Sequence, residues 1–371
     1  MTSKREALRI VADALQPEAG GLKAAIRRRK AQDWMVPLRL ANDHFLATSM
    51  FASLAQAHRL AALPCEVNDY LSLLHRNNAE RNEALRGQAL EMLRALQAAS
   101  IPTIVLKGGL SLFLDHYPDR GARMFRDLDV LVPPSAMAAA ITALGRLGYN
   151  AETRYQPIQH AYAEFIREND PGAVDLHVEV IDAHYILPHR EIWDSAEVLE
   201  ADGVRFQAPS PTHRVLHNLL HATIHHLGNH YRGSLKLQQV YDFTLLARHG
   251  AGKIDWRLIE DRLREHRLVT ALQSYTLAAS TLFGLTWPLS EPASLAARFH
   301  FRRCIAQLCV PALETAMMPW ANLRGAFAWH RMNALYSEKR EPLVAHQFHH
   351  ALEFIRKSTA KGLLNRLFRI G

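Results

Sequence analysis

Two aspartates separated by a single residue are the feature of this sequence that points most directly to chemistry. Asp127 and Asp129 lie in the run DLDVLV, whose alternating polar and apolar residues predict a β-strand. Residues i and i+2 of a strand share one face, so the two carboxylates project together while Leu128 and Val130 point into a core. Paired carboxylate oxygens suit a hard cation such as Mg²⁺ better than Zn²⁺. The spacing therefore predicts a magnesium site on this strand.

A pair of glycines lies upstream of the aspartates. Residues 104–106 form a short apolar run, which Lys107, Gly108 and Gly109 interrupt before the mostly apolar residues 110–114. This order predicts a strand, a glycine turn and a helix, and consecutive glycines let backbone N–H groups approach a ligand closely. Such a turn could hold the phosphates that magnesium brings. The alternative is a polar strand face beside an ordinary turn, but the two features at this spacing favour the chemical interpretation.

A second alternating segment supplies a third acid. Residues 174–180, VDLHVEV, predict a strand with Asp175, His177 and Glu179 on the face opposite its apolar side chains. We expect an antiparallel neighbour to bring Asp175 beside the aspartate pair. For His177 and Glu179, an ordinary solvent-facing strand surface is as well supported as a functional role.

Six motifs in the middle of the chain together resemble a known family. They are LKGG at 106–109, HYPD at 116–119, Arg123, DLDVLV at 127–132, LGY at 147–149 and VDLH at 174–177. The set is similar to that of the uncharacterised bacterial nucleotidyltransferases of the polymerase-β-type superfamily. The resemblance extends to DW at 33–34, RN at 81–82 and IP at 101–102. In that superfamily a third carboxylate on a neighbouring strand completes the site, and Asp175 matches its position.

The resemblance implies an α+β fold, in which a small mixed β-sheet forms the nucleotidyltransferase core between two helical regions. Helical periodicity agrees with this, because residues 66–99 carry a stripe of leucines. We therefore expect an N-terminal helical region at 1–99, the core at 100–208 and a C-terminal helical region at 209–371. Residues 203–208 are expected to form a short edge strand.

The resemblance also implies a reaction and the residues that perform it. A nucleoside monophosphate moves from a nucleoside triphosphate such as ATP to a hydroxyl-type acceptor, and pyrophosphate leaves. Asp127, Asp129 and Asp175 would hold one or two Mg²⁺ ions, with Asp175 completing a two-metal site or taking the acceptor's proton. The nucleotide-binding residues would be Lys107, Gly108, Gly109, Arg123 and Arg126. For both arginines the alternative is an ion pair that only orients an aspartate.

Four histidines recur every four residues along a predicted helix. They are His213, His217, His221 and His225. A zinc hydrolase site is one interpretation, but H-E-x-x-H is absent and no cysteine is nearby, so packing or phosphate contact is favoured. The family pattern also matches His221, Lys236 and Asp242, of which Asp242 would position a basic side chain.

Composition bounds the class of protein. The 371 residues are 49% hydrophobic, which allows a sizeable core, and 44 Lys and Arg against 36 Asp and Glu give a net charge of +8. This modest excess suits anionic partners, including nucleotides and nucleic acid. Three cysteines without a C-x-x-C motif, no export signal and no long apolar run favour a cytoplasmic protein without a membrane span.

Two questions stay open at the level of sequence. The acceptor can be a small molecule, a peptide, a protein or an RNA, because acceptor choice depends on the walls of a pocket. The alternative function is a catalytically inactive protein that binds a nucleotide and serves as a partner for another enzyme, although three acids argue against a dead site. The basic, amphipathic segment at 354–371 favours a helix docked on its own domain over one bound to an anionic surface.

Overall fold

The computed structural model describes residues 2–16, 29–154, 161–225 and 229–336. The chain groups into two compact units. The first comprises Met1–Asn218, Leu237–Ile254 and Ala279–Thr286, and the second comprises Leu219–Lys236, Asp255–Ala278 and the chain from Trp287 onward. The predicted basic helix at 354–371 lies outside the described residues.

A mixed β-sheet forms the centre of the first unit. Its strands are β1 (Ile104–Val105), β2 (Asp127–Leu131), β3 (Asn150–Arg154), β4 (Ala161–Ile166), β5 (Ala173–His177), β6 (Glu197–Ala201) and β7 (Val204–Ala208). Their spatial order is β3-β4-β5-β2-β1-β7-β6. The pairs β2–β5 and β1–β7 are parallel, and the other neighbours are antiparallel. The two acid-bearing strands, β2 and β5, are therefore central neighbours.

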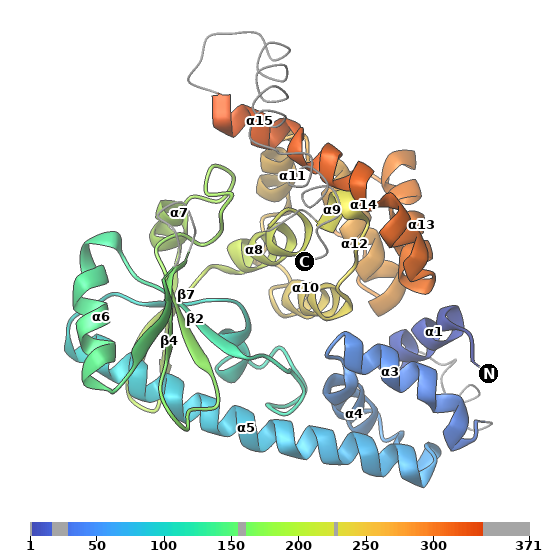
Figure 1. Cartoon of the computed structure of the whole chain (residues 1–371), viewed down its shortest axis with the longest axis horizontal. Helices are drawn as coiled ribbons and strands as arrows, with labels where there is room; N and C mark the ends of the chain where they lie inside the picture. The colour runs from blue at the N-terminus through green and yellow to red at the C-terminus, as the bar shows by residue number, and fades with distance from the viewer. Residues whose placement is uncertain (1, 17–28, 155–160, 226–228, 337–371) are drawn as a thin grey trace. The chain divides into compact units, whose positions relative to one another are not determined.

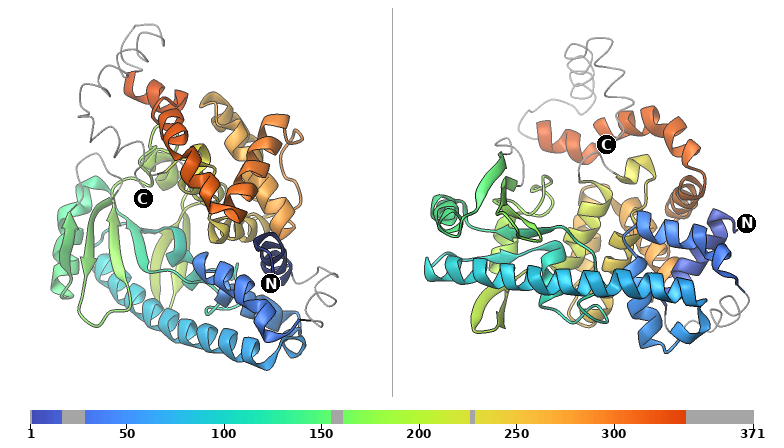
Figure 2. Two further views of the ribbon diagram at one scale, coloured as in Figure 1. Left: turned by 45° about the vertical axis from the view of Figure 1, so that its right-hand side comes forward. Right: turned by 60° about the horizontal axis from the view of Figure 1, so that its bottom comes forward.

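Helices accompany the sheet in the first unit. They are α1 (Lys4–Ala14), α3 (Met35–Asp43), α4 (Ala47–Gln56), α5 (Cys65–Ala98), α6 (Met137–Arg146), α7 (His189–Asp194) and α10 (Leu237–His249), with short 3-10 turns η1 (Ala31–Trp34), η2 (Leu60–Ala62), η3 (Lys107–Leu112) and η4 (Pro134–Ala136). The long helix α5 contacts α4 near its start and runs along the sheet near its end (Figures 1 and 2).

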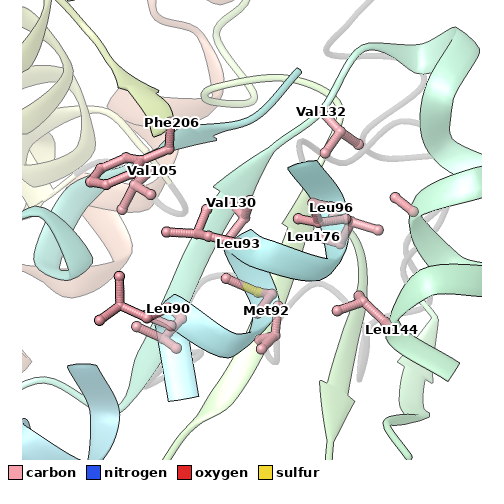
Figure 3. Packing of buried hydrophobic residues seen from close by; sticks show 14 of the residues in the cluster. Leu90, Met92, Leu93, Leu96, Val105, Val130, Val132, Leu144, Leu176 and Phe206 are labelled. Atoms are coloured by element: carbon pink, nitrogen blue, oxygen red, sulfur yellow. The ribbon is translucent and has the colours of Figure 1, made fainter. Parts of the chain in front are cut away.

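The core of this unit lies between α5 and one face of the sheet. Leu90, Met92, Leu93 and Leu96 of α5 belong to one buried cluster with side chains of the sheet and of α6 (Figure 3). Those partners include Val105, Val130, Leu176, Phe206 and Leu144. Fully burying each aliphatic side chain contributes about 1.5–3 kcal/mol. Because Leu128, Val130, Val174 and Leu176 belong to this cluster, the alternating residues of β2 and β5 project from the opposite face.

The second unit is helical in its described residues. It contains α9 (Asn229–Arg232), α11 (Trp256–Glu265), α13 (Leu295–Cys309), α14 (Pro311–Ala326) and α15 (Trp329–Tyr336). Two further helices, α8 (Pro211–Thr223) and α12 (Val269–Phe283), continue from one unit into the other. Among the described residues, no helix has both the length and the apolar composition that are needed to cross a bilayer.

The predicted fold class is confirmed, because a mixed sheet is flanked by helices on both sides in sequence. Two details of the strand predictions are wrong. The strand expected at the sheet edge is β7, which lies between β1 and β6, because residues 197–201 form an additional antiparallel strand beside it. The segment predicted as a strand through Val180 ends at His177, so Glu179 is outside the strand.

Candidate active site

The register between β2 and β5 brings the predicted acids together. In this parallel pair Asp127 lies opposite Ala173, Asp129 opposite Asp175 and Leu131 opposite His177. Neighbouring strands are about 4.8 Å apart, so residues in register that share a face have adjacent side chains. The expectation of an antiparallel neighbour is wrong. The chain leaves β2 through α6 and returns through the antiparallel series β3, β4 and β5, which makes β5 run in the same direction as β2.

Three of these side chains form a group that could hold a metal ion. One ligand atom from each of Asp129, Asp175 and His177 lies within 4.8 Å of the others. Among the residues that the structure describes, no other set of three or more acidic, histidine or cysteine side chains is close enough to share one ion. Asp127 shares their face of the sheet but is outside the group. Two carboxylates and an imidazole are a donor set that suits a divalent cation.

Asp129 lies at the centre of a buried ionic network. Its Oδ1 accepts a hydrogen bond from Lys107 Nζ at 2.6 Å and lies 2.9 Å from His177 Nε2. Burial alone would raise the pKa of Asp129, but the positive charge of Lys107 and the hydrogen bond to His177 lower it far below its usual range. Burial correspondingly opposes the charge on Lys107, yet the Asp129 carboxylate raises the pKa of the ammonium. Both groups are therefore ionised.

The other two aspartates behave in the opposite way. Burial, followed by the negative charges of Asp129 and Asp127, raises the pKa of Asp175 to about 7. Burial and the charge of Asp129 also raise the pKa of Asp127. In addition, Oδ1 of Asp175 is buried without a hydrogen-bond partner among the described residues. A buried acceptor of this kind is destabilising until it is paired, so the site favours an added cation.

The glycine turn lies directly beside Asp129. The backbone N–H of Leu106 donates to the carbonyl of Asp129 at 2.9 Å, and η3 follows at once. Lys107 has a φ of 45°, in the left-handed region, which costs a non-glycine residue about 1–3 kcal/mol. Its ion pair with Asp129 offsets this cost. The turn, the lysine and the acids are thus parts of one arrangement.

Both glycines allow close packing in this turn. A Cβ added to Gly108 would lie 3.2 Å from Cζ of Arg123 and 3.2 Å from Cβ of Phe125, and it would collide with the guanidinium nitrogen. One added to Gly109 would lie 3.1 Å from Val105 Cγ1. Gly108 is therefore needed to fit the turn against Arg123 and Phe125, whereas a Cβ at Gly109 would require a small shift of Val105.

Arg123 is held by a carboxylate from a distant part of the first unit. Its Nε and Nη2 donate to Oδ1 and Oδ2 of Asp242 in α10, at 3.0 and 2.8 Å, and the hydroxyl of Tyr117 also donates to Asp242. Burial opposes the charge on Arg123, but Asp242 raises the pKa of the guanidinium. The geometry agrees with the ion-pair interpretation of Arg123, with Asp242 rather than a β2 aspartate as partner. The side chain of Arg126 is exposed next to Asp127.

The remaining candidates lie elsewhere in the sequence. His221 and Lys236 belong to the second unit, where His221 stacks on His225 at 4.8 Å between ring centroids and Lys236 is exposed. His213, in the first unit, contacts the hydroxyl oxygens of two serines through Nδ1, at 2.8 and 2.9 Å. Within the described residues, the histidine row contributes no ligand to a metal-binding group.

A row of polar residues on α5 is a feature that sequence reasoning missed. Asn78, Asn82 and Gln88 are buried, and Arg81 is partly buried. All four donate hydrogen bonds to backbone carbonyls in the loops that precede β2 and β5. The spacing of three or four residues from Asn78 to Arg81, Asn82 and then Leu85 could have revealed this row. That spacing places the polar residues on the same side of the helix as the buried leucines that follow.

Comparison with known proteins identifies the family. The family described as uncharacterised nucleotidyltransferase matches residues 30–284, more than two thirds of the chain, and the protein belongs to this family. The match spans the glycine turn, all the candidate acids and Asp242. A search of curated proteins finds no match.

Proposed function

We propose that this member of the nucleotidyltransferase family is a metal-dependent enzyme that moves a nucleoside monophosphate from a nucleoside triphosphate to a hydroxyl-type acceptor. The observation that carries the proposal is the in-register pairing of Asp129 with Asp175 beside Asp127. The glycine turn starts next to the same aspartate, which supports the proposal that its backbone N–H groups bind the triphosphate. The site lies in the proposed core region, 100–208, with support from the helical regions 1–99 and 209–371.

Asp127, Asp129 and Asp175 would hold one or two divalent cations, with Mg²⁺ as the first choice because the ligands are mainly carboxylate oxygens. A bound cation would supply electrostatic stabilisation of the charge that develops on the phosphates. His177 orients Asp129 through the contact between Nε2 and Oδ1. Lys107 provides a fixed positive charge beside the acids, and it can neutralise charge on the departing pyrophosphate.

The bonds that form and break can be assigned. The acceptor hydroxyl oxygen forms a bond to the α-phosphorus, the bond between that phosphorus and the bridging oxygen of the β-phosphate breaks, and pyrophosphate leaves with the bonding electrons. Asp175 would either complete the two-metal site or accept the proton of the acceptor hydroxyl. The acceptor can be a small molecule, a peptide, a protein or an RNA.

The test uses Asp127→Asn and Asp175→Asn rather than a change of Asp129. Asp129 is buried and pairs with the partly buried Lys107 ammonium, so its loss would disturb folding as well as chemistry. Each variant is incubated with α-labelled nucleoside triphosphates, Mg²⁺ and a cell extract, and labelled product and pyrophosphate are measured. We expect transfer by the wild type and loss of transfer in both variants, while Glu200→Gln, at an exposed position of β6, retains it.

Undiminished transfer in Asp127→Asn and Asp175→Asn would reject the assignment of the acids. Calorimetry on the same proteins separates the alternative function. Tight triphosphate binding by the wild type, with no labelled product after hours with extract, would instead favour a nucleotide-binding partner protein.

A further inference from the structure

The long helix α5 contacts the polypeptide just before both acid-bearing strands begin. The guanidinium of Arg81 donates through Nη1 to the carbonyl of Phe125 and through Nη2 to the carbonyl of Pro171, the latter at 2.9 Å. A single planar side chain therefore bridges two segments that are far apart in sequence.

The two carbonyls occupy equivalent positions in the β-ladder. Phe125 precedes Asp127 by two residues, and Pro171 precedes Ala173 by two residues. Asp127 and Ala173 form the first pair of the parallel ladder. Arg81 thus links the two chains two residues before the first pair of the ladder.

Neighbouring residues make the same junction tight. Gln88 Nε2 donates to the carbonyl of Gly172 at 2.7 Å. A Cβ added to Gly172 would lie 2.6 Å from Leu85 Cδ2 and 2.9 Å from the carbonyl oxygen of Arg126, so only glycine fits there. The chain before β5 is therefore confined between α5 and the chain before β2.

The loop that leads to β2 is held by two further side chains of α5. Asn78 Nδ2 donates to the carbonyls of Gly121 and Arg123 at 2.7 and 2.9 Å. Asn82 Nδ2 donates to the carbonyls of Arg120 and Arg123 at 2.5 and 2.8 Å. These amides fix only one of the two strands, whereas Arg81 contacts both.

We propose that Arg81 is a positioning residue that locks the register of β2 against β5 and thereby sets the separation of Asp129 and Asp175. This inference rests on the proposed function for its consequence, since a correct separation matters only if the two acids share a ligand. Lysine cannot replace arginine here, because an ammonium lacks the planar fork that reaches two fixed carbonyls at once.

The test compares Arg81→Gln and Arg81→Lys with Arg94→Gln. Arg94 also lies on α5 and donates to a backbone carbonyl, that of Asp202 at 3.3 Å, but it touches neither acid-bearing strand. The first measurement is amide hydrogen exchange, with α1 as internal reference. We expect both Arg81 variants to accelerate exchange in β2 and β5 by about tenfold, which corresponds to about 1.4 kcal/mol. Arg94→Gln should leave these strands unchanged.

The second measurement is Mn²⁺ binding, followed in the wild type, Arg81→Gln, Asp175→Asn and the double variant below their unfolding temperatures. We expect Arg81→Gln to weaken binding by about tenfold in the wild-type background and to have no further effect once Asp175 is replaced. If Arg81 had a purely structural role, Arg81→Gln would lower the stability of the protein, but its effect on Mn²⁺ affinity would be the same with and without Asp175.

Separate results identify which idea fails. Normal exchange in β2 and β5 of the Arg81 variants, or an equal loss of Mn²⁺ affinity with and without Asp175, overturns the positioning role. Rescue by Arg81→Lys to wild-type values also overturns it. Absence of Mn²⁺ binding by the wild type counts against the proposed function. In that case the exchange rates of β2 and β5 alone determine whether Arg81 fixes the register of these strands.

Discussion

Replacement of Asp242 by Asn should destabilise the first unit strongly. The carboxylate accepts two hydrogen bonds from Arg123 and one from the Tyr117 hydroxyl, and the two ionic side chains are only 13% and 8% exposed. The amide removes the negative charge and turns one acceptor into a donor, so the Arg123 guanidinium stays buried without its counter-charge.

The expected loss follows from this burial. Removing one partner of a buried ion pair costs about 3–5 kcal/mol, because the remaining charge is not solvated. An exposed pair contributes about 0–1 kcal/mol. The pair between Arg205 and Glu200 is of the exposed kind, with side chains 73% and 56% accessible, and Glu200→Gln is therefore the matched control. Replacing both partners, as in Arg123→Met with Asp242→Leu, should recover much of the loss.

Urea denaturation followed by circular dichroism measures these differences. The free energy of unfolding should fall by about 3–5 kcal/mol in Asp242→Asn and by less than about 1 kcal/mol in Glu200→Gln. Equal small losses in the two variants would refute the claim that Asp242 holds Arg123 as a buried structural pair. Arg123 would then be available as a nucleotide-binding cation.

Three further predictions address the turn, the acids and the metal. Gly108→Ala should destabilise by about 1–3 kcal/mol through contact with Arg123 and Phe125, whereas Gly87→Ala, with open space in α5, should be neutral or stabilising in the same denaturation assay. Because the folded pKa of Asp175 is raised from 3.8 to about 7, the metal-free folded state keeps a proton that the unfolded state releases, and stability should fall as pH rises from about 4 to about 7. Asp175→Asn should remove this part of the slope, and identical slopes would contradict the assignment. Saturating Mg²⁺ or Mn²⁺ should raise the melting temperature of the wild type, and an equal rise in Asp175→Asn would show that the cation binds elsewhere.

The parts of the site that follow a local pattern could be predicted from the sequence. The alternation in DLDVL and AVDLH is a property of each segment alone, and both segments form strands with the acids on one face. The direction of pairing could not be read in this way. It depends on the path through α6 and the β3–β4 hairpin, so an antiparallel neighbour was expected where a parallel one occurs.

The supports of the site were less visible because their partners are distant. Arg123 and Asp242 are separated by 119 positions, and nothing near either residue indicates the other. Helical periodicity alone predicts a solvent-facing position for polar residues such as Arg81 and Asn82, since polar residues on a helix usually face water. That interpretation is wrong for the buried Asn82 and the partly buried Arg81, because backbone carbonyls of the β2 and β5 loops accept their hydrogen bonds.

Mn²⁺ binding in the presence of a nucleoside triphosphate tests the central claim most directly. Free Mn²⁺ is quantified by electron paramagnetic resonance during titration of the wild type, Asp127→Asn, Asp175→Asn and Glu200→Gln. If the acids of β2 and β5 form one metal and triphosphate site, the wild type and Glu200→Gln bind Mn²⁺ together with the triphosphate, and both aspartate variants bind it much more weakly. Equal binding by all four proteins would contradict the assignment of the site.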